Sequence, residues 1–248
     1  SDVLEFLLRT HPLDCPTCAK AGECELQDHA DVHGPQRSDA EWPKRSAPPV
    51  RLGPQVSYYS SRCIGCNRCA RFTDEVSGGG ELSPAFRGPE TVVSLFPGRE
   101  LGDGMAGNNV DICPVGALVE PESLFDPPPW TLRGINSICP GCSSGCNIRV
   151  DINDGVIQRL KPRANLAVNS YWMCDEGRYG WREIQRHDRL AAPRLREDDD
   201  QETATWEQAV EFAGLRLPGG DGGLAVVLNG SLTNEEAYLL LKLATDTW

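Results

Sequence analysis

The chain has 248 residues, a formal net charge of −12 at pH 7 and eleven cysteines. So acidic a chain lacks the basic surface that phosphate binding needs, which argues against a nucleic-acid partner. No apolar run approaches the roughly 20 residues of a membrane-spanning helix, so we expect no direct membrane span. The cysteine count is odd, no signal peptide is visible, and closely spaced Cys-x2-Cys pairs suit metal better than disulfides. These features favour metal ligation in a reducing compartment, the cytoplasm.

The first cysteine group lies near the start of the chain. Apolar residues at helical spacing predict a short amphipathic helix over residues 1–10. The stretch HPLDCPTCAKAGEC follows, with H-x3-C-x2-C-x5-C spacing formed by His11, Cys15, Cys18 and Cys24. Ligands crowded this closely indicate one metal centre, although a zinc knuckle or a pair of disulfides is an alternative at this point.

The next segment carries no metal signal. Its polar run begins at Glu25 and contains His29 and His33, which we expect to be solvent-exposed because no cysteine lies nearby to share a metal. Residues 39–54 are rich in proline and charge and are predicted to be a connector.

The second cysteine group is the most specific signal. It consists of CIGCNRC and a remote Cys-Pro, which supply Cys63, Cys66, Cys69 and Cys113. Ferredoxin-type clusters use this C-x2-C-x2-C spacing with a distant Cys-Pro, whereas zinc ribbons use two C-x2-C pairs. The spacing therefore favours an iron–sulfur cube over zinc. Between the cysteines, residues 91–95 alternate and predict a strand.

Three arginines flank this group: Arg62, Arg68 and Arg71. One interpretation is that they are solvated surface residues. The other is that they raise the reduction potential of a cluster by offsetting thiolate charge. The sequence does not separate the two.

The third group follows a proline run at 127–129, which marks a boundary. Its spacing is C-x2-C-x3-C-x27-C, formed by Cys139, Cys142, Cys146 and Cys174. Residues 147–152 alternate in polarity, and Asp154-Gly155 turns the chain into a second strand through Leu160, so Cys146 is expected at the mouth of a hairpin. Four thiolates again fit an iron–sulfur cluster, with zinc as a stronger rival here than in the second group.

From about residue 188 the sequence contains no further cysteine and its pattern changes to that of helices and a strand. The charged run 196–202 predicts a solvated loop, and capping boxes at Thr205 and Thr233 predict two helices. Between them we expect a turn at 219–223 and a buried parallel strand at 224–228. Helix, strand and helix predict the opening of an α/β domain, and without a G-x-G-x-x-G motif we assign no nucleotide site.

The order of the three groups resembles the family of the G subunit of bacterial NADH–quinone oxidoreductase, respiratory complex I, called the 75 kDa subunit in mitochondria. The resemblance rests on HPLDCP, on CIGCNRC with ICPVGAL, and on MCDEGRYGW, and it covers nearly the whole chain. Family members usually begin with a 2Fe–2S ferredoxin domain and continue well past this length. The resemblance therefore implies an internal fragment, with that 2Fe–2S cluster expected only in the missing N-terminal part.

The resemblance also implies cofactors and partners. Each cysteine group would hold a 4Fe–4S cluster, with His11 as the one histidine ligand. The first two clusters would carry electrons from NADH, by way of FMN on a neighbouring subunit, toward quinone, and the third would lie off the main path. The implied partners are the FMN- and NADH-binding subunit and the next cluster-carrying subunit of the peripheral arm. The implied location is the cytoplasmic face of the inner membrane, and proton translocation would be coupled to the reaction by the whole complex.

We expect an α+β chain in which cluster domains precede the start of an α/β domain of the molybdopterin-oxidoreductase type. The first predicted domain, at 1–40, is a 4Fe–4S domain with one histidine and three cysteine ligands. It is followed by a ferredoxin-like 4Fe–4S domain at 41–128, a small β-rich 4Fe–4S domain of the Mo/W bis-MGD type at 129–187 and the truncated α/β start at 188–248. No residue is predicted to act as a general acid, base or nucleophile, because the chemistry would belong to the clusters.

Two alternatives differ in class. A catalytic subunit of an NAD-linked formate dehydrogenase shares this cluster series, but there a lysine usually follows the last cysteine in C-x-K-G. Here Glu176 takes that place, and a carboxylate is a poor partner for an anionic molybdopterin, so we expect none. The other alternative is a zinc-stapled scaffold without redox activity.

Overall fold

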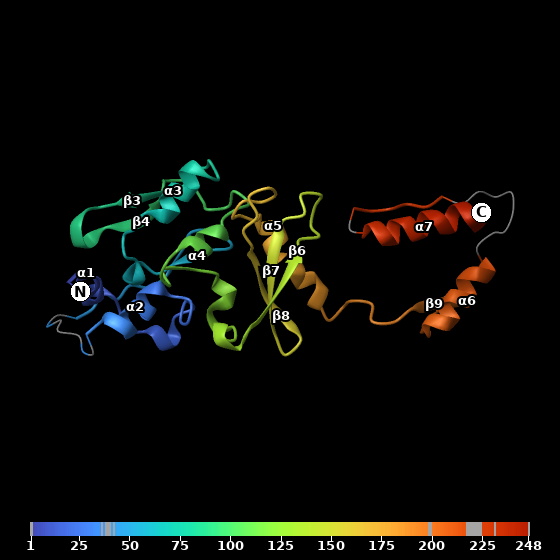
Figure 1. Cartoon of the computed structure of the whole chain (residues 1–248), viewed down its shortest axis with the longest axis horizontal. Coiled ribbons are helices and arrows are strands. Elements are labelled where there is room, and N and C mark those ends of the chain that lie inside the picture. The colour runs from blue at the N-terminus through green and yellow to red at the C-terminus, as the bar shows by residue number, and fades with distance from the viewer. Residues whose placement is uncertain are drawn as a thin grey trace. The chain divides into compact units, whose positions relative to one another are not determined.

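The computed structural model describes residues 2–35, 37, 41, 43–197, 200–216, 225–230 and 232–247. The chain forms two compact units, one of residues 1–139 and 144–181 and the other of residues 140–143 and 182–248 (Figure 1). Helix and sheet are mixed in it, as predicted. None of the helices in the described ranges combines the length and the hydropathy of a membrane span.

The first unit begins with two helices that contact each other. The predicted helix is present as α1 (Asp2–Thr10), which buries Leu4. The polar run after the first cysteine group forms a second helix, α2 (Glu25–His33), which the sequence did not predict. Its single buried side chain in the described structure is Leu26, so its apolar face is too narrow to give a periodic signal. His29 and His33 are exposed, as predicted.

Short strands surround the second cysteine group. A three-stranded antiparallel sheet has the order β1 (Val50–Arg51), β2 (Ser57–Tyr58) and β5 (Leu118–Val119). A hairpin pairs β3 (Leu82–Ala85) with β4 (Val92–Leu95), which confirms the strand predicted at 91–95. Helix α3 (Arg68–Glu75) contains Cys69, and helix α4 (Asn108–Ile112) ends just before Cys113.

The third group frames an antiparallel sheet of three strands: β6 (Arg133–Ile138), β7 (Asn147–Asn153) and β8 (Val156–Pro162). The predicted hairpin is β7–β8, turned by Asp154 (φ 48°) and Gly155 (φ 81°), the pair of left-handed residues that a tight hairpin turn needs. Strand β6 was not predicted, because all six of its residues are exposed and show no alternation. Helix α5 (Asp175–Tyr179) packs on β8.

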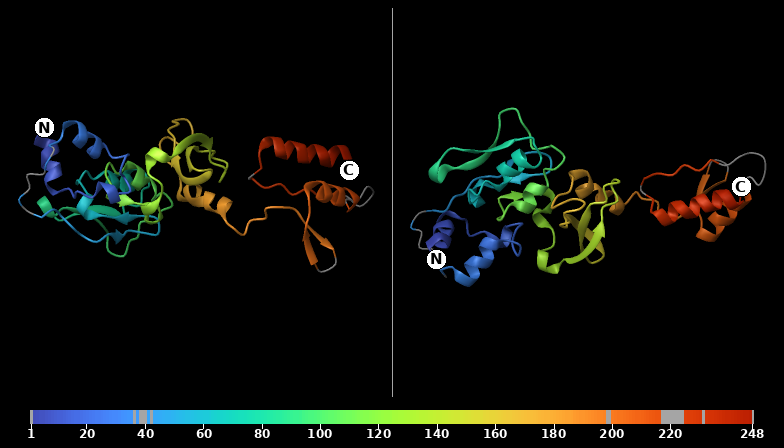
Figure 2. Two further views of the ribbon diagram at one scale, coloured as in Figure 1. Left: turned by 90° about the horizontal axis from the view of Figure 1, so that it is seen from below. Right: turned by 45° about the horizontal axis from the view of Figure 1, so that its top comes forward.

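The second unit contains a hairpin, β9 (Arg194–Glu197) with β10 (Asp200–Thr203), and two helices, α6 (Trp206–Arg216) and α7 (Asn234–Thr247). Figure 2 shows the hairpin in orange. It corrects the loop predicted for the charged run 196–202. The backbone pairing places Arg196 opposite Gln201 and Leu195 opposite Glu202, so the charged side chains lie on an exposed hairpin and do not prevent the strands from forming. Short 3-10 turns complete the chain at Cys15–Thr17, Ser60–Arg62, Gly88–Glu90, Pro121–Phe125, Pro129–Thr131 and Gly180–Gln185.

Both predicted capping boxes are present. The Thr205 and Gln208 side chains each accept a bond from the other's backbone N–H, at 3.3 and 2.9 Å, and Thr233 and Glu236 do the same at 3.2 and 2.8 Å. The strand predicted at 224–228 is wrong over the residues that the structure describes. Residues 225–228 are not in a strand and Val227 is 93% exposed, since no strand in the described ranges pairs with them. Leu224 and the predicted turn at 219–223 lie outside the described residues.

Candidate metal centres

The first group is built on tight turns. Pro16 lies in the 3-10 turn Cys15–Thr17, and the Cys18 N–H donates to the Cys15 carbonyl at 3.1 Å at its end. Buried Cys24 is the residue just before α2. Burial raises the pKa of the Cys15 and Cys18 thiols, and negative charge on Cys24 raises both further. The Cys15 and Cys18 thiols thus both lie within electrostatic reach of Cys24.

His11 is half-buried beside charged groups. Burial lowers its pKa, Asp14 opposes that shift, and Arg62 and Lys44 add to it. The neutral imidazole that burial favours is the form that binds a metal. Its place as the fourth ligand stays a prediction.

The second group is assembled from distant parts of the chain. Gly65 (φ 67°) and Asn67 (φ 58°) bend CIGCNRC with two left-handed residues, and Cys69 then enters α3. Burial raises the pKa of Cys69 to about 12, helped first by the charge of Cys113 and then by those of Cys63 and Cys66. Cys113 follows α4 directly, and it lies in the same core cluster as Cys69, with Cys63 packed against that cluster.

In the third group, Cys139 lies close to both Cys146 and Cys174. The Cys139 N–H donates to the Cys146 carbonyl at 2.8 Å. Cys174 caps α5, its sulfur accepting from the Gly177 N–H at 3.4 Å. A Cβ on Gly177 would lie 2.9 Å from the Cys139 sulfur and 3.5 Å from that of Cys174, so both sulfurs face this glycine. Cys142 falls in the other compact unit, and its membership rests on sequence spacing.

The donor set fits iron–sulfur ligation. The structure pairs none of the eleven cysteines in a disulfide. Within the described ranges, no three His, Cys, Asp or Glu side chains converge closely enough to hold a single metal ion. A cluster is held at separate iron corners, so its ligands surround a larger object than one ion. Buried thiols that repel one another as thiolates are stabilised by a bound cationic centre.

The three arginines that flank the second cysteine group differ in burial. Arg68 and Arg71 are exposed, and Arg71 pairs with Glu75 on its own helix at 3.0 Å. Arg62 is buried, with 5% of its side chain exposed, and pairs with Asp14 beside the first group. Sequence alone could not find this difference, because burial of one arginine depends on the packing of the two groups.

Gly116, which the sequence patterns did not single out, lies where the first two cysteine groups meet. A Cβ on Gly116 would lie 2.1 Å from the Cys18 sulfur, so only glycine fits there without displacing that thiol. Gly116 follows Cys113 by three residues, and the Pro-Val-Gly run after the cysteine was its only sequence signal.

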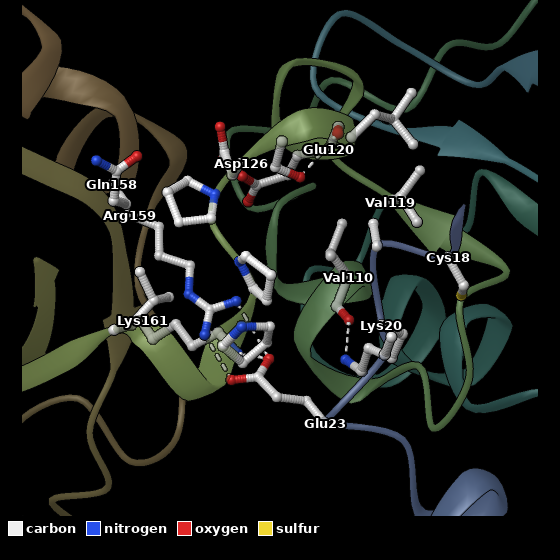
Figure 3. Close-up of a pocket in the computed structure, with 18 of the residues that line it drawn as sticks. Cys18, Lys20, Glu23, Val110, Val119, Glu120, Asp126, Gln158, Arg159 and Lys161 are labelled. Carbon is white, nitrogen blue, oxygen red and sulfur yellow. Dashed lines mark hydrogen bonds and ion pairs between the residues drawn. The ribbon is translucent and has the colours of Figure 1, made fainter. Parts of the chain in front are cut away.

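A cavity of about 270 Å³ lies between the segment after Cys18, the loop at 120–132 and strand β8 (Figure 3). Glu23 points across it and pairs with Arg159 at 2.5 Å and Lys161 at 2.8 Å. Burial alone would raise the pKa of Glu23, but Lys161 and Arg159 lower it to about 2. Lys20 donates to the Val110 carbonyl at 3.1 Å on the opposite wall. These contacts tie the segment after Cys18 to strand β8 and to helix α4, which leads to Cys113.

Comparison with known domain families matches three regions. Residues 1–39 match the NADH-ubiquinone oxidoreductase-G iron–sulfur binding region, and residues 53–119 match the ferredoxin-like domain of NADH-quinone oxidoreductase subunit 3. Residues 133–186 match the molybdopterin oxidoreductase Fe4S4 domain. The order is that of the three cysteine groups, and iron–sulfur binding domains are therefore present.

Two curated relatives agree with these domains. The G subunit of the NADH-quinone oxidoreductase of Streptomyces coelicolor is 38% identical over 98% of this chain, which spans 29% of that protein. The NADH-ubiquinone oxidoreductase 75 kDa subunit of Reclinomonas americana is 38% identical over 97% of this chain, which spans 35% of that protein. Among solved structures, an NAD+-reducing [NiFe]-hydrogenase in the H2-reduced state is 32% identical, with a TM-score of 0.43, over 51% of this chain and 55% of that one.

The chain thus spans about a third of the length of the curated relatives that it matches. Within that length, the order of the three cysteine groups agrees with the domain matches and with the 38% identity that extends over nearly the whole chain. This chain belongs to the family of the NADH-quinone oxidoreductase G subunit, the 75 kDa subunit.

Proposed function

We propose that this chain relays electrons within an NADH–quinone oxidoreductase, from NADH and FMN on a neighbouring subunit toward quinone. The observation that carries the proposal is the second group, in which buried Cys69 and Cys113 lie in one core cluster with Cys63 packed against it, although more than forty residues separate Cys69 from Cys113. The ferredoxin spacing and the three-dimensional contact agree, and a 4Fe–4S site needs both.

Three clusters are proposed, one on each group. The ligands would be His11, Cys15, Cys18 and Cys24 for the first, Cys63, Cys66, Cys69 and Cys113 for the second, and Cys139, Cys142, Cys146 and Cys174 for the third. When bound, a 4Fe–4S cluster takes up and gives back one electron at a time. The residues of this chain hold the thiolates, keep water from the buried sulfurs and set the charge around them.

The remaining parts of the proposal follow from the family. The partners are the FMN- and NADH-binding subunit and the next cluster-carrying subunit of the peripheral arm, at the cytoplasmic face of the inner membrane. The whole complex couples the reaction to proton translocation, and this chain contains no NADH or quinone site. Domain limits at 40, 128 and 187, and the absence of molybdopterin, are part of the same proposal.

Two observations bear on the alternatives. Glu176, where a formate dehydrogenase carries lysine, lies on α5 close to Cys174, and its carboxylate would repel an anionic pterin. For a zinc scaffold, the second group is the least suitable, because its spacing is that of a ferredoxin.

The test is metal analysis of the anaerobically purified protein with redox-poised EPR. Three 4Fe–4S clusters predict about twelve irons per chain, broad visible absorbance and three separate EPR signals that appear on reduction. A colourless protein that holds zinc alone would overturn the redox proposal. Bound molybdenum would favour the formate dehydrogenase alternative.

A further inference from the structure

Arg62 is a buried cation between two of the cluster sites. Its Nε and Nη2 both donate to Asp14 Oδ2, at 2.9 and 2.6 Å, and its guanidinium lies 4.4 Å from the centre of the Tyr59 ring. Arg62 directly precedes Cys63 of the second group, and Asp14 directly precedes Cys15 of the first. The ion pair therefore joins the two ligand segments.

Arg62 also contacts Gly116. Arg62 Nη1 donates to the Gly116 carbonyl at 3.5 Å, and a Cβ on that glycine would lie 3.6 Å from Arg62 Cδ. The same Cβ would lie 2.1 Å from the Cys18 sulfur. Arg62 and a ligating thiol of the first group thus pack against one glycine, which comes from the loop after Cys113. The charge of Arg62 lies at the junction of the two groups.

A charge in this position acts strongly on its neighbours. In a buried site the effective dielectric is far below that of water, so a fixed charge changes the energy of a nearby redox centre much more than a solvated one does. Reduction adds a negative charge to a cluster, which a cation stabilises and a carboxylate opposes. Arg71 offers the contrast, because 71% of its side chain is exposed and its charge is screened by solvent.

We propose that the Arg62–Asp14 ion pair sets the reduction potential of the cluster at the first group, with Arg62 raising that potential and Asp14 lowering it. The inference rests on the proposed iron–sulfur function. It assigns to Arg62 the potential-raising role that the sequence left open, and it assigns Arg68 and Arg71 to the solvated surface. Since the two charges act in opposite directions, they form a matched pair for experiment.

The experiment is redox-poised EPR of the cluster-loaded protein as wild type, R62Q, D14N and the double variant D14N/R62Q. The midpoint potential of the first cluster should shift downward in R62Q, because the Asp14 carboxylate is left uncompensated beside Cys15. It should shift upward in D14N and return close to the wild-type value in the double variant. R71Q, which removes an exposed arginine from the same segment, should leave the midpoint unchanged.

Iron content and EPR spin count are measured for each variant, so that a lost cluster is not mistaken for a shifted one. If R62Q fails to load, the midpoint in D14N provides the test, because Asp14 is 34% exposed, its replacement is sterically neutral, and Arg62 keeps its bond to the Gly116 carbonyl and its contact with the Tyr59 ring. An unchanged midpoint in D14N, or equal shifts in R62Q and R71Q, overturns the inference while leaving the proposed function intact. A wild-type protein without a first-group cluster would instead overturn the proposed function.

Discussion

The side chain of Asn108 holds the backbone of Met173 by two hydrogen bonds. Its Nδ2 donates to the Met173 carbonyl at 2.8 Å, and its Oδ1 accepts from the Met173 N–H at 3.2 Å. Next along the chain, the Asp175 carboxylate accepts from the N–H groups of Ala106 and Gly107 at 2.9 and 2.8 Å. The segment that carries Cys174 is thereby fastened to the segment that leads to Cys113.

Asn108→Ala should destabilise the protein by about 2–4 kcal/mol, because it leaves a buried N–H and a buried carbonyl of Met173 without their partner. Asn108 is fully buried, so water cannot replace the lost bonds. Urea denaturation followed by tryptophan fluorescence measures the change. The control is Asn153→Ala, which removes one exposed bond to the Thr131 carbonyl and should cost less than about 1 kcal/mol. Equal losses in both variants would contradict the structural role given to Asn108.

Asp151→Asn tests the buried charges of the β7–β8 sheet. Asp151 is fully buried and pairs with Arg149 at 2.6 Å and Arg159 at 2.8 Å. Removing its charge leaves the partly exposed Arg149 without its partner and Arg159 with Glu23 alone. Because Asp151 itself is fully buried, we expect a loss of about 3 kcal/mol, toward the lower end of what breaking a buried ion pair costs. The matched control is Asp188→Asn, in an ion pair with Arg186 whose side chains are 65% and 61% exposed.

That exposed pair should contribute little to stability, because solvent screens it. Both variants are compared by urea denaturation at low and at moderate salt. Added salt should reduce the small effect of Asp188→Asn and leave that of Asp151→Asn nearly unchanged. A small, salt-sensitive effect for Asp151→Asn would show that its ion pairs are solvated.

Features with local causes were predictable from the sequence. The capping boxes at Thr205 and Thr233 and the turn at Asp154-Gly155 depend on neighbouring residues, and each is present in the structure. The cysteine spacings are local too, apart from the long separations to Cys113 and Cys174. These local patterns were enough to indicate the metal class and the order of the groups.

Features that depend on packing were not predictable. Strand β6 is exposed along its whole length, so its pairing with β7 left no alternation to read. The apolar residues 225–228 have the composition of a buried strand, but a strand also needs a paired neighbour, and the described part of the chain provides none. Arg62 and Arg71 both flank the same cysteine run, and only the fold distinguishes the buried cation from the exposed one.

Thr233→Ala should destabilise helix α7, because it removes the side chain that accepts from the Glu236 N–H at 3.2 Å. Loss of such a cap costs about 1 kcal/mol. Far-UV circular dichroism over a thermal scan should show earlier loss of helical signal. Thr233→Ser keeps the accepting hydroxyl and should behave as wild type, so equal behaviour of the two variants would contradict the capping role.

Cys66→Ser and Cys142→Ser distinguish a cluster on the electron path from one beside it. Both cysteines are exposed, so the two substitutions disturb the fold to a similar small extent. A serine hydroxyl is a poor replacement for a thiolate ligand, so each variant should lose or alter the cluster of its own group.

Cys66→Ser should abolish or badly impair NADH-to-quinone transfer in the assembled complex, whereas Cys142→Ser should leave much of that transfer intact. NADH oxidation with a quinone acceptor measures the rate, and EPR verifies which cluster has changed. Equal loss of turnover in two normally assembled variants would mean that the third group also lies on the path.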